Sequence, residues 1–181
     1  MKIGRTVMKL SLVLAVLATG AGHAGAQEKA TEPALKIGVY DSRGITIAWA
    51  HSEEVRQEDA KLKADFEQAK AKGDTAQARL LEKEGQTMGL GLHLRGFSTA
   101  GAGDLLRKVA DGLPAVAREA GVALIVSKWE LAYMDPGVEV VDVTVPLAKL
   151  FNPDEETFKY LDELAAQKPV PLDEVLRNPG D

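Results

Sequence analysis

The pattern of apolar and polar positions is most informative between residues 115 and 150 of the chain. A helical pattern there ends at Gly121, and the continuous apolar run VALIV follows at residues 122–126. Glycine is typical of a helix end, and an unbroken apolar run of this length predicts a strand buried on both faces. We therefore expect a sheet whose core includes Ile125.

A second strand is predicted a short distance downstream. Residues 131–134 indicate further extended chain, the sequence DPG at 135–137 is typical of a turn, and residues 138–143 alternate as a strand requires. Thr144 then stands where a cap would begin a short helix. An earlier β-prone segment, KIGVY at 36–40, predicts the first strand of the same body.

The sequence DSRG at 41–44 leaves two interpretations open. It is compatible with a turn between elements. Because Ile45, Ile47 and Trp49 then resume an apolar rhythm, a loop or a helix start is equally compatible with it.

Two long helices are predicted between residues 52 and 95. Ser52 is a suitable N-cap for the first helix, and Asp74 with Gln77 has the spacing of a capping box for the second. Residues 88–95 also carry a period-two pattern that would suit a strand, although we favour helix. The larger apolar side chains of both helices form one narrow, coiled-coil-like stripe: Val55, Leu62, Phe66, Leu81 and Met88.

This stripe admits two roles. The simpler role is packing against a neighbouring helix, and the alternative is contact with a ligand or client. Helices of about 20 residues extend roughly 30 Å, and a hairpin of two such helices is too thin to bury its own apolar stripe. We therefore expect the hairpin to project from a body or to lean on another copy of the chain.

The remaining helices are shorter. The sequence GFSTAGAG at 96–103 is a loop by composition, and Asp104 is the predicted cap of a helix in which Pro114 causes a kink or starts a new turn. Asn152 is the predicted cap of a final helix, with Pro153 as its first residue. Two leucines are expected to anchor that helix on the body: Leu161 and Leu164.

The first 26 residues have the pattern of an export signal. An apolar run at 10–17 precedes a small-residue motif that predicts cleavage after Ala26. The run is shorter than the roughly 20 residues that a membrane span needs, and no later segment reaches that length, so we expect no integral membrane segment. The predicted product is periplasmic and begins with a flexible lead-in at 27–34.

Charge and cysteine content narrow the range of partners. The formal net charge of the chain is −5, and removal of the basic signal would shift it to about −8. An acidic protein without a Lys/Arg-rich run is a poor partner for nucleic acid. The chain contains no cysteine, so it uses neither disulfides nor thiolate ligands.

None of the motifs in the chain predicts catalysis. The sequence GFSTA at 96–100 lacks the final glycine of a nucleophile elbow and a preceding buried strand. His51 and His93 do not have metal-ligand spacing. The acidic residues at 53–54 and 154–156 are most simply helix-start charges. We therefore expect no enzymatic activity, no cofactor and no metal site.

Several pieces of the chain follow one another in an order known from one protein family. They are KIGVYDSR at 36–43, VAREAG at 116–121, VALIV followed by Ser127 and Lys128, Tyr133 before the turn, and VDVT at 141–144. In this order, around a helical excursion and behind an export signal, they resemble the Skp/OmpH family of periplasmic chaperones for outer-membrane proteins. The resemblance implies a small β-containing body that trimerises, with helical hairpins reaching outward around an unfolded client, and action without ATP, metal or covalent chemistry.

The resemblance also assigns residues to the two parts of such a molecule. The hairpin stripe would supply packing within the hairpin or client contacts. The body's sheet, as core or as oligomer contacts, would contain Ile37, Val39, Leu124, Ile125, Val126, Val138 and Val140.

Three features depart from the family. The predicted hairpin is short, the mature chain is acidic where the best-known members are strongly basic, and residues 152–181 continue beyond the family's usual end. The client therefore differs from that of the basic members, or the protein has none. We predict an ATP-independent holdase for unfolded exported or outer-membrane proteins. The alternative is a non-catalytic, oligomeric structural or interaction protein of the periplasm.

These inferences combine into one expected architecture, an α+β fold. A small β-sheet body is assigned to residues 35–51 and 96–151, and an antiparallel α-helical hairpin protrudes from it at 52–95. Additional helices complete the body, and residues 152–181 form a C-terminal helix and tail.

Overall fold

The computed structural model describes residues 35–177, which belong to a single unit of the chain, Pro33–Asp181. The predicted signal peptide, its cleavage after Ala26 and the lead-in at 27–34 lie outside the described residues. The last four residues of the predicted tail lie outside them as well.

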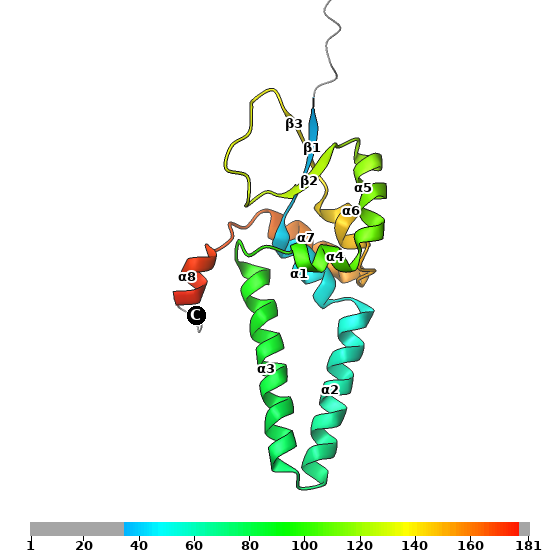
Figure 1. The fold of residues 1–181 in the computed structure, drawn as a ribbon, viewed down its shortest axis with the longest axis vertical. Coiled ribbons are helices and arrows are strands. Elements are labelled where there is room, and N and C mark those ends of the chain that lie inside the picture. The colour runs from blue at the N-terminus through cyan, green and yellow to red at the C-terminus, as the bar shows by residue number, and fades with distance from the viewer. Residues whose placement is uncertain (1–34, 178–181) are drawn as a thin grey trace, which may run out of the picture. The chain divides into compact units, whose positions relative to one another are not determined.

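A three-stranded sheet forms one end of the described unit (Figure 1). The strand order is β2-β1-β3, and β1 pairs in parallel with both neighbours. Ile37 of β1 lies opposite Leu124 on one side and Val140 on the other. The strands are β1 (Lys36–Tyr40), β2 (Leu124–Ser127) and β3 (Glu139–Asp142).

The predicted α+β class is wrong for this sheet. That class denotes helices set apart from an antiparallel sheet, whereas every pairing here is parallel. The reason lies in the order of the strands, because β1 lies between β2 and β3 and so separates the two strands that are closest in sequence. Parallel neighbours need long crossover connections, and the helices between β1 and β2 supply the first of them.

Strand β2 is less buried than predicted. Ile125 lies in a strand, as expected, but is only half-buried, and Leu124 is 46 % exposed. An edge strand of a small sheet has a neighbour on one side only, so burial on both faces is not reached. Residues 131–134 are not a strand in the structure, and β3 is shorter than the predicted segment at 138–143.

The hairpin consists of α2 (Glu53–Ala71) and α3 (Thr75–Phe97), which meet at a tight turn and separate toward the body (Figure 1). Gly73 in this turn has a φ of 71°, a conformation that glycine adopts at little cost. The Ser52 hydroxyl accepts a hydrogen bond from the Val55 N–H at 3.4 Å, and Asp74 accepts one from the Gln77 N–H at 3.0 Å. Both predicted caps are confirmed.

Helix α3 is longer than its pattern indicated. The ambiguous segment at 88–95 is helical, and the helix continues through Phe97. The predicted loop at 96–103 is therefore wrong at both ends, because α4 already begins at Gly103. The loop between these helices is held by the C-terminal segment, where the Val170 N–H donates to the Phe97 carbonyl at 3.0 Å.

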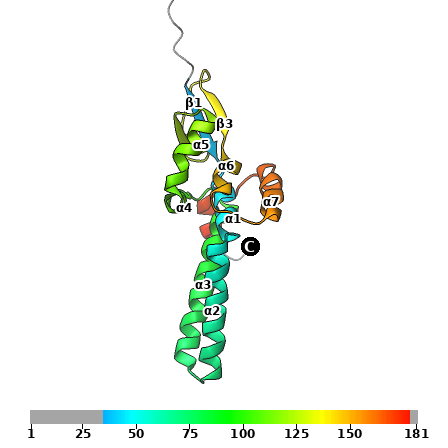
Figure 2. The same cartoon turned by 90° about the vertical axis from the view of Figure 1, so that its right-hand side faces the viewer.

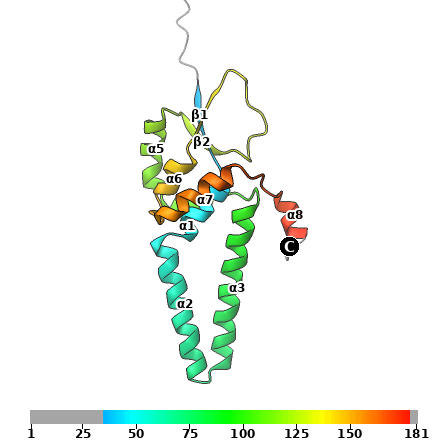
Figure 3. The ribbon, with the colours of Figure 1, turned by 180° about the vertical axis from the view of Figure 1, so that it is seen from behind.

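Helix α1 (Ser42–Ala50) resolves the open interpretation of DSRG as a helix start. Asp41 is its N-cap, and its carboxylate accepts a hydrogen bond from the Arg43 N–H at 3.0 Å. This helix contacts α2, α3, α4, α6 and α7, so it links the sheet to the hairpin and to the C-terminal helices. Figure 2 shows α4 and α5 on one side of α1 and α7 on the other, and Figure 3 shows α7 crossing α1.

The segment after the hairpin is divided into short helices. A new helix begins at Leu113 with Pro114 in its first turn, which is one of the two effects predicted for this proline. Gly121 ends the helix with a φ of 66°. The predicted cap role of Asp104 is wrong, because its carboxylate instead pairs with Arg95 at 2.9 Å. The helices are α4 (Gly103–Lys108), a 3-10 turn (Ala110–Gly112) and α5 (Leu113–Ala120).

Two other predicted caps are wrong. Thr144 is the first residue of its helix, and its hydroxyl accepts a hydrogen bond from the Asp41 N–H at 2.9 Å. Asn152 has a φ of 48°, and Asp154 is the cap of the next helix. The helices are α6 (Thr144–Lys149), α7 (Glu155–Ala165) and α8 (Leu172–Arg177).

The apolar core lies where α1, α4, α5, α6 and α7 meet beneath the sheet. Leu161 and Leu164 of α7 are buried, which confirms that this helix is anchored on the body. None of the helices described within residues 35–177 is long and apolar enough to cross a membrane. The largest buried apolar side chains of the core cluster include Tyr40, Ile45, Leu105, Leu106, Leu147, Phe151 and Leu161.

Candidate functional site

Part of the predicted hairpin stripe lies between α2 and α3, where Leu62, Leu81 and Met88 line the space between the two helices and Val55 and Phe66 do not. Val55 is buried at the base of the hairpin, while Leu62 and Phe66 are half-buried. Gly85 of α3 lies opposite Leu62, because a Cβ at that glycine would stand 3.4 Å from Leu62 Cδ2. The absence of a side chain at Gly85 therefore leaves room for Leu62, and the two helices pack there.

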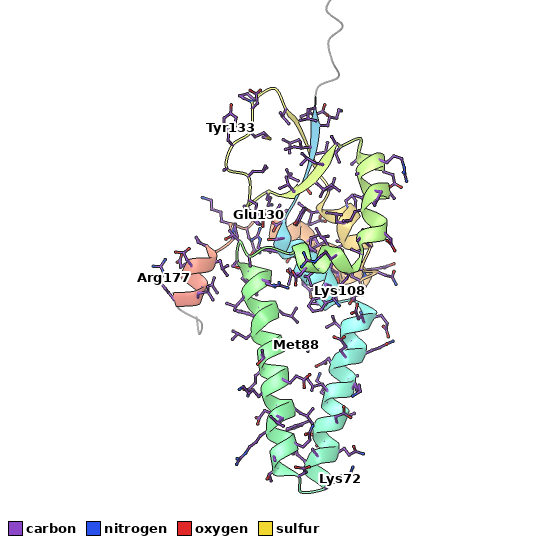
Figure 4. All side chains as sticks on the ribbon, in the orientation of Figure 1. Lys72, Met88, Lys108, Glu130, Tyr133 and Arg177 are labelled. Carbon is purple, nitrogen blue, oxygen red and sulfur yellow. The ribbon has the colours of Figure 1, made fainter. Side chains whose placement is uncertain are left out.

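A groove, which we call the hairpin groove, runs between the two helices. It has a volume of about 390 Å³, and its apolar lining comes from Leu62, Leu81 and Met88. Figure 4 shows Met88 partway along α3, between the turn near Lys72 and the body. Charged side chains form the rest of the lining: Glu58, Lys61, Asp65 and Glu84.

The apolar side chains of the groove are not sealed from water. Leu62, Leu81 and Met88 are all half-buried, since two helices alone cannot enclose a stripe between them. Two further leucines of α3, Leu80 and Leu90, are exposed and do not line the groove. The hairpin thus offers incompletely covered apolar surface along its length.

Charged pairs stabilise α2 independently of the body. Lys61 pairs with Asp65 and Lys63 with Asp59, each at 2.6 Å and one helical turn apart. Such exposed pairs contribute only about 0.2–0.5 kcal/mol each. The Lys61–Asp65 pair also lines the hairpin groove, so part of the charged border of the groove is itself ion-paired.

The predicted sheet residues differ in burial. Ile37 and Val39 of the central strand are buried, whereas Ile125, Val126 and Val138 are half-buried. Leu124 and Val140 lie on the two edge strands and are 46 % and 40 % exposed. The edges of the sheet therefore carry apolar side chains that the rest of residues 35–177 leaves partly uncovered.

A second cluster, which the sequence patterns do not predict, lies at the carboxyl ends of the three parallel strands. Asp41 follows β1, Lys128 follows β2 and Asp142 ends β3. Lys128 Nζ lies 2.8 Å from Asp41 Oδ2, and the Thr144 N–H donates to Asp142 Oδ1 at 2.8 Å. The parallel sheet brings these side chains together, because its strands all end at the same edge.

Arg43 completes this cluster from the first turn of α1. Its Nη2 donates to Asp41 Oδ2 at 2.7 Å and to the carbonyls of Leu164 and Gln167 at 3.2 and 3.0 Å. The Trp129 indole N–H donates to Asp41 Oδ1 at 3.3 Å, and the Arg43 guanidinium lies 5.5 Å from the centre of the Trp129 ring. The sequence clue is an Asp-x-Arg directly after a predicted strand, a pattern that is equally compatible with a turn, a loop or a helix start.

The charges of this cluster neutralise one another. Burial alone would raise the pKa of the Asp41 carboxyl, but hydrogen bonds from Arg43 and Lys128, together with their positive charges, hold that pKa below its usual value. Asp41 is therefore an ionised, fully engaged partner and not a proton donor at neutral pH. The cluster joins β1 to the end of α7.

The side chains considered for catalysis or metal binding make hydrogen bonds or packing contacts within the protein. The Ser98 hydroxyl accepts a hydrogen bond from the Ala100 N–H at 3.1 Å. His51 Nδ1 lies 2.8 Å from the Thr157 hydroxyl, and the His93 ring packs on Phe97 at 4.7 Å between centroids. In the part of the chain that the structure describes, His, Asp and Glu do not form a group of three that could hold a metal ion.

Comparison with protein-family models, with curated proteins and with solved structures finds no match to this chain.

Proposed function

We propose that this protein is an ATP-independent, holdase-type chaperone of the periplasm that binds unfolded exported or outer-membrane proteins. The observation that carries the proposal is the hairpin groove, in which Leu62, Leu81 and Met88 remain half-buried and are surrounded by charged side chains. Apolar segments of an unfolded chain need such a surface to stay separated from one another. The resemblance of the sequence to the Skp/OmpH family supports the same function.

The chemistry of the groove suits weak, repeated contact. A few half-buried apolar side chains bring a modest gain on binding, at about 25 cal/mol per Å² of apolar surface covered. Glu58, Lys61, Asp65 and Glu84 keep the surroundings hydrated and limit tight association. Several weak contacts in one assembly can hold a client firmly while each segment remains free to leave.

Assembly into a homotrimer belongs to the proposal. The body is small, and domains of its size bury a modest fraction of their surface unless they associate. Exposed Leu124 and Val140 on the sheet edges provide apolar surface for a neighbouring copy. Hairpins from associated bodies would together offer several grooves to one client.

The function can be tested with two pairs of substitutions on the same helix. Leu81→Ser with Met88→Ser removes apolar lining from the groove, whereas Leu80→Ser with Leu90→Ser changes two exposed leucines that do not line it. Each protein is mixed with an unfolded outer-membrane barrel without ATP, and client aggregation is followed by light scattering. We expect the groove pair to lose most of the suppression and the control pair to retain it.

Two results would contradict the mechanism. One is that the Leu81→Ser, Met88→Ser protein suppresses client aggregation fully while circular dichroism shows unchanged helix content. The other is an equal loss of aggregation suppression in both pairs. That result would show that any leucine of α3 can contact the client and that the hairpin groove is not the binding site.

The alternative function is that of an oligomeric structural or interaction protein without clients. The observation that favours it is the exposed loop between β2 and β3, where Tyr133 is 80 % exposed and available to a folded partner (Figure 4). A wild-type protein that suppresses the aggregation of no unfolded client, yet forms a stable oligomer, would favour this alternative.

A further inference from the structure

A second groove lies on the body beside the base of the hairpin. Its lining comes from α1 and its C-cap, from the last residue of α3, and from α7 and the chain just after it. Its volume is about 300 Å³. It shares no residue with the hairpin groove. We call it the aromatic groove, and its main lining residues are Ile47, His51, Phe97, Tyr160, Glu163 and Leu164.

The walls of the aromatic groove combine an apolar floor with accessible rings. Ile47 is half-buried and Leu164 is buried, and both also contribute to the packing of the body. Phe97 and Tyr160, which come from different helices, are 53 % and 44 % exposed. The His51 ring stands edge-on to Tyr160 at 6.0 Å between centroids.

The groove carries negative charge. Glu163 is its only charged lining residue, and within residues 35–177 its carboxylate is not part of a salt bridge. Glu156 accepts a hydrogen bond from the Tyr160 hydroxyl at 3.3 Å. The negative charges of Glu156, Glu163 and Asp154 raise the pKa of the Tyr160 phenol, which is the effect expected of an acidic surrounding.

Two arginines near the groove, Arg43 and Arg56, are already engaged by other carboxylates. Arg43 donates to the carbonyls of Leu164 and Gln167 behind the groove, but its charge is paired with Asp41 inside the body. Arg56 pairs with Glu53 at 3.0 Å. A groove with aromatic walls and an acidic rim fits a cation that also presents a flat face and an aliphatic stem.

We propose that the aromatic groove binds one arginine side chain of an extended polypeptide segment. The methylene stem lies on Ile47 and Leu164, and the guanidinium stacks against the exposed rings, where aromatic faces attract cations. The same guanidinium pairs with the Glu163 carboxylate through two parallel hydrogen bonds, a geometry that lysine cannot reproduce. The proposal rests on the proposed function, because the segment is part of an unfolded client.

A site of this kind would give the protein a preference among clients. The hairpin groove contacts apolar segments, and the aromatic groove selects those that carry arginine nearby. An acidic chaperone with this site would hold arginine-bearing clients more firmly than acidic ones, and the preference would weaken as salt screens the charges.

The test uses the full chain and a labelled decapeptide that carries a single arginine in a Gly/Ser/Ala background. A matched peptide replaces arginine with citrulline, which keeps the shape and removes the charge, and two others carry lysine or phenylalanine. Binding is measured by fluorescence anisotropy. We expect the arginine peptide to bind at least about fivefold more tightly than the citrulline peptide, with lysine between them.

Protein variants locate the site. Glu163→Gln and Phe97→Ala are each expected to lower affinity for the arginine peptide about three- to tenfold. Glu119→Gln on α5 makes the same change in net charge, and Tyr133→Ala removes an exposed ring elsewhere, so both should leave affinity unchanged. Circular dichroism checks that each variant is folded.

Several outcomes would overturn the proposal. They are equal binding of arginine and citrulline peptides, preference for phenylalanine, absence of binding by any peptide, or an equal effect of Glu119→Gln and Glu163→Gln. The Leu81→Ser, Met88→Ser protein should keep its affinity for the arginine peptide. A failed aggregation test would therefore leave the arginine site standing, and a failed peptide test would leave the chaperone proposal standing.

Discussion

Arg43 Nη2 lies 2.7 Å from Oδ2 of Asp41, and the two side chains are only 2 % and 5 % exposed. The Asp41 carboxylate also accepts hydrogen bonds from the Arg43 backbone N–H and the Trp129 indole. Arg43 in turn reaches carbonyls at the end of α7. One buried ion pair thus joins the end of β1, the start of α1 and the C-terminal part of the body.

Arg43→Met should strongly destabilise the protein. The substitution leaves the Asp41 carboxylate buried with fewer partners and removes the Arg43 donor from the carbonyls of Leu164 and Gln167. Breaking a buried pair in this way costs about 3–5 kcal/mol of the free energy of unfolding. Urea denaturation followed by circular dichroism measures the loss.

A matched control is available on α8. Arg177 pairs with Asp173, but these side chains are 71 % and 75 % exposed. Arg177→Met should change the free energy of unfolding by no more than about 0.5 kcal/mol. Similar losses in both variants would contradict the structural importance assigned to the buried pair.

Stability should fall in acid partly because of Asp41. Its folded-state pKa lies below the ordinary value, so its contribution is fully present above the unfolded pKa of about 3.9. That contribution is lost as the pH falls through the folded pKa. The free energy of unfolding should therefore decrease less steeply between about pH 5 and pH 2 in Asp41→Asn than in the wild type. Parallel slopes in the two proteins would exclude this role.

The hairpin should accept added helix propensity in α3. A Cβ at Gly89 or Gly91 would meet no atom within 4 Å. Alanine at each position should raise the free energy of unfolding by about 0.5–1 kcal/mol. Gly73→Ala is the opposing control, because a φ of 71° strains alanine by about 1 kcal/mol or more. Thermal unfolding measures the three variants. If the Gly89→Ala and Gly91→Ala proteins are not more stable than Gly73→Ala, the helical assignment of α3 is wrong.

The sheet edges provide a test of assembly. Leu124→Lys places a charge on an exposed edge position, so it should reduce the mass seen by light scattering while the circular dichroism spectrum stays unchanged. Leu176→Lys on α8 makes the same change at another exposed leucine and should keep the wild-type mass. If the wild type has the mass of one chain across micromolar concentrations, the proposed trimer is wrong.

Local signals made the hairpin predictable from the sequence. Ser52 and Asp74 cap their helices through N–H groups three residues further on, so neighbouring residues contain the necessary information. Two predicted caps failed, since Asp154 rather than Asn152 caps α7 and a distant contact decides the role of Thr144. The Thr144 hydroxyl is engaged by the N–H of Asp41, which lies far away in sequence.

The arrangement of the sheet and the buried ion pair could not be predicted in the same way. The patterns indicated strands near the observed positions, but not that β1 lies between β2 and β3. The partners of Arg43 include carbonyls beyond the predicted body, in a C-terminal extension that no local pattern links to β1. The aromatic groove was missed for the same reason, since Phe97 and Tyr160 become neighbours only through tertiary packing.

The central position of β1 has a consequence for the order of folding. Its first neighbour in the sheet begins at Leu124 and its second at Glu139, so β1 remains without strand partners until most of the chain has been synthesised. Helices α2 and α3 are joined by a tight turn and can close through short-range contacts, on a faster timescale than the sheet. The hairpin should therefore form on the nascent chain before the body exists. In that interval the unpaired β1 is itself an aggregation-prone segment.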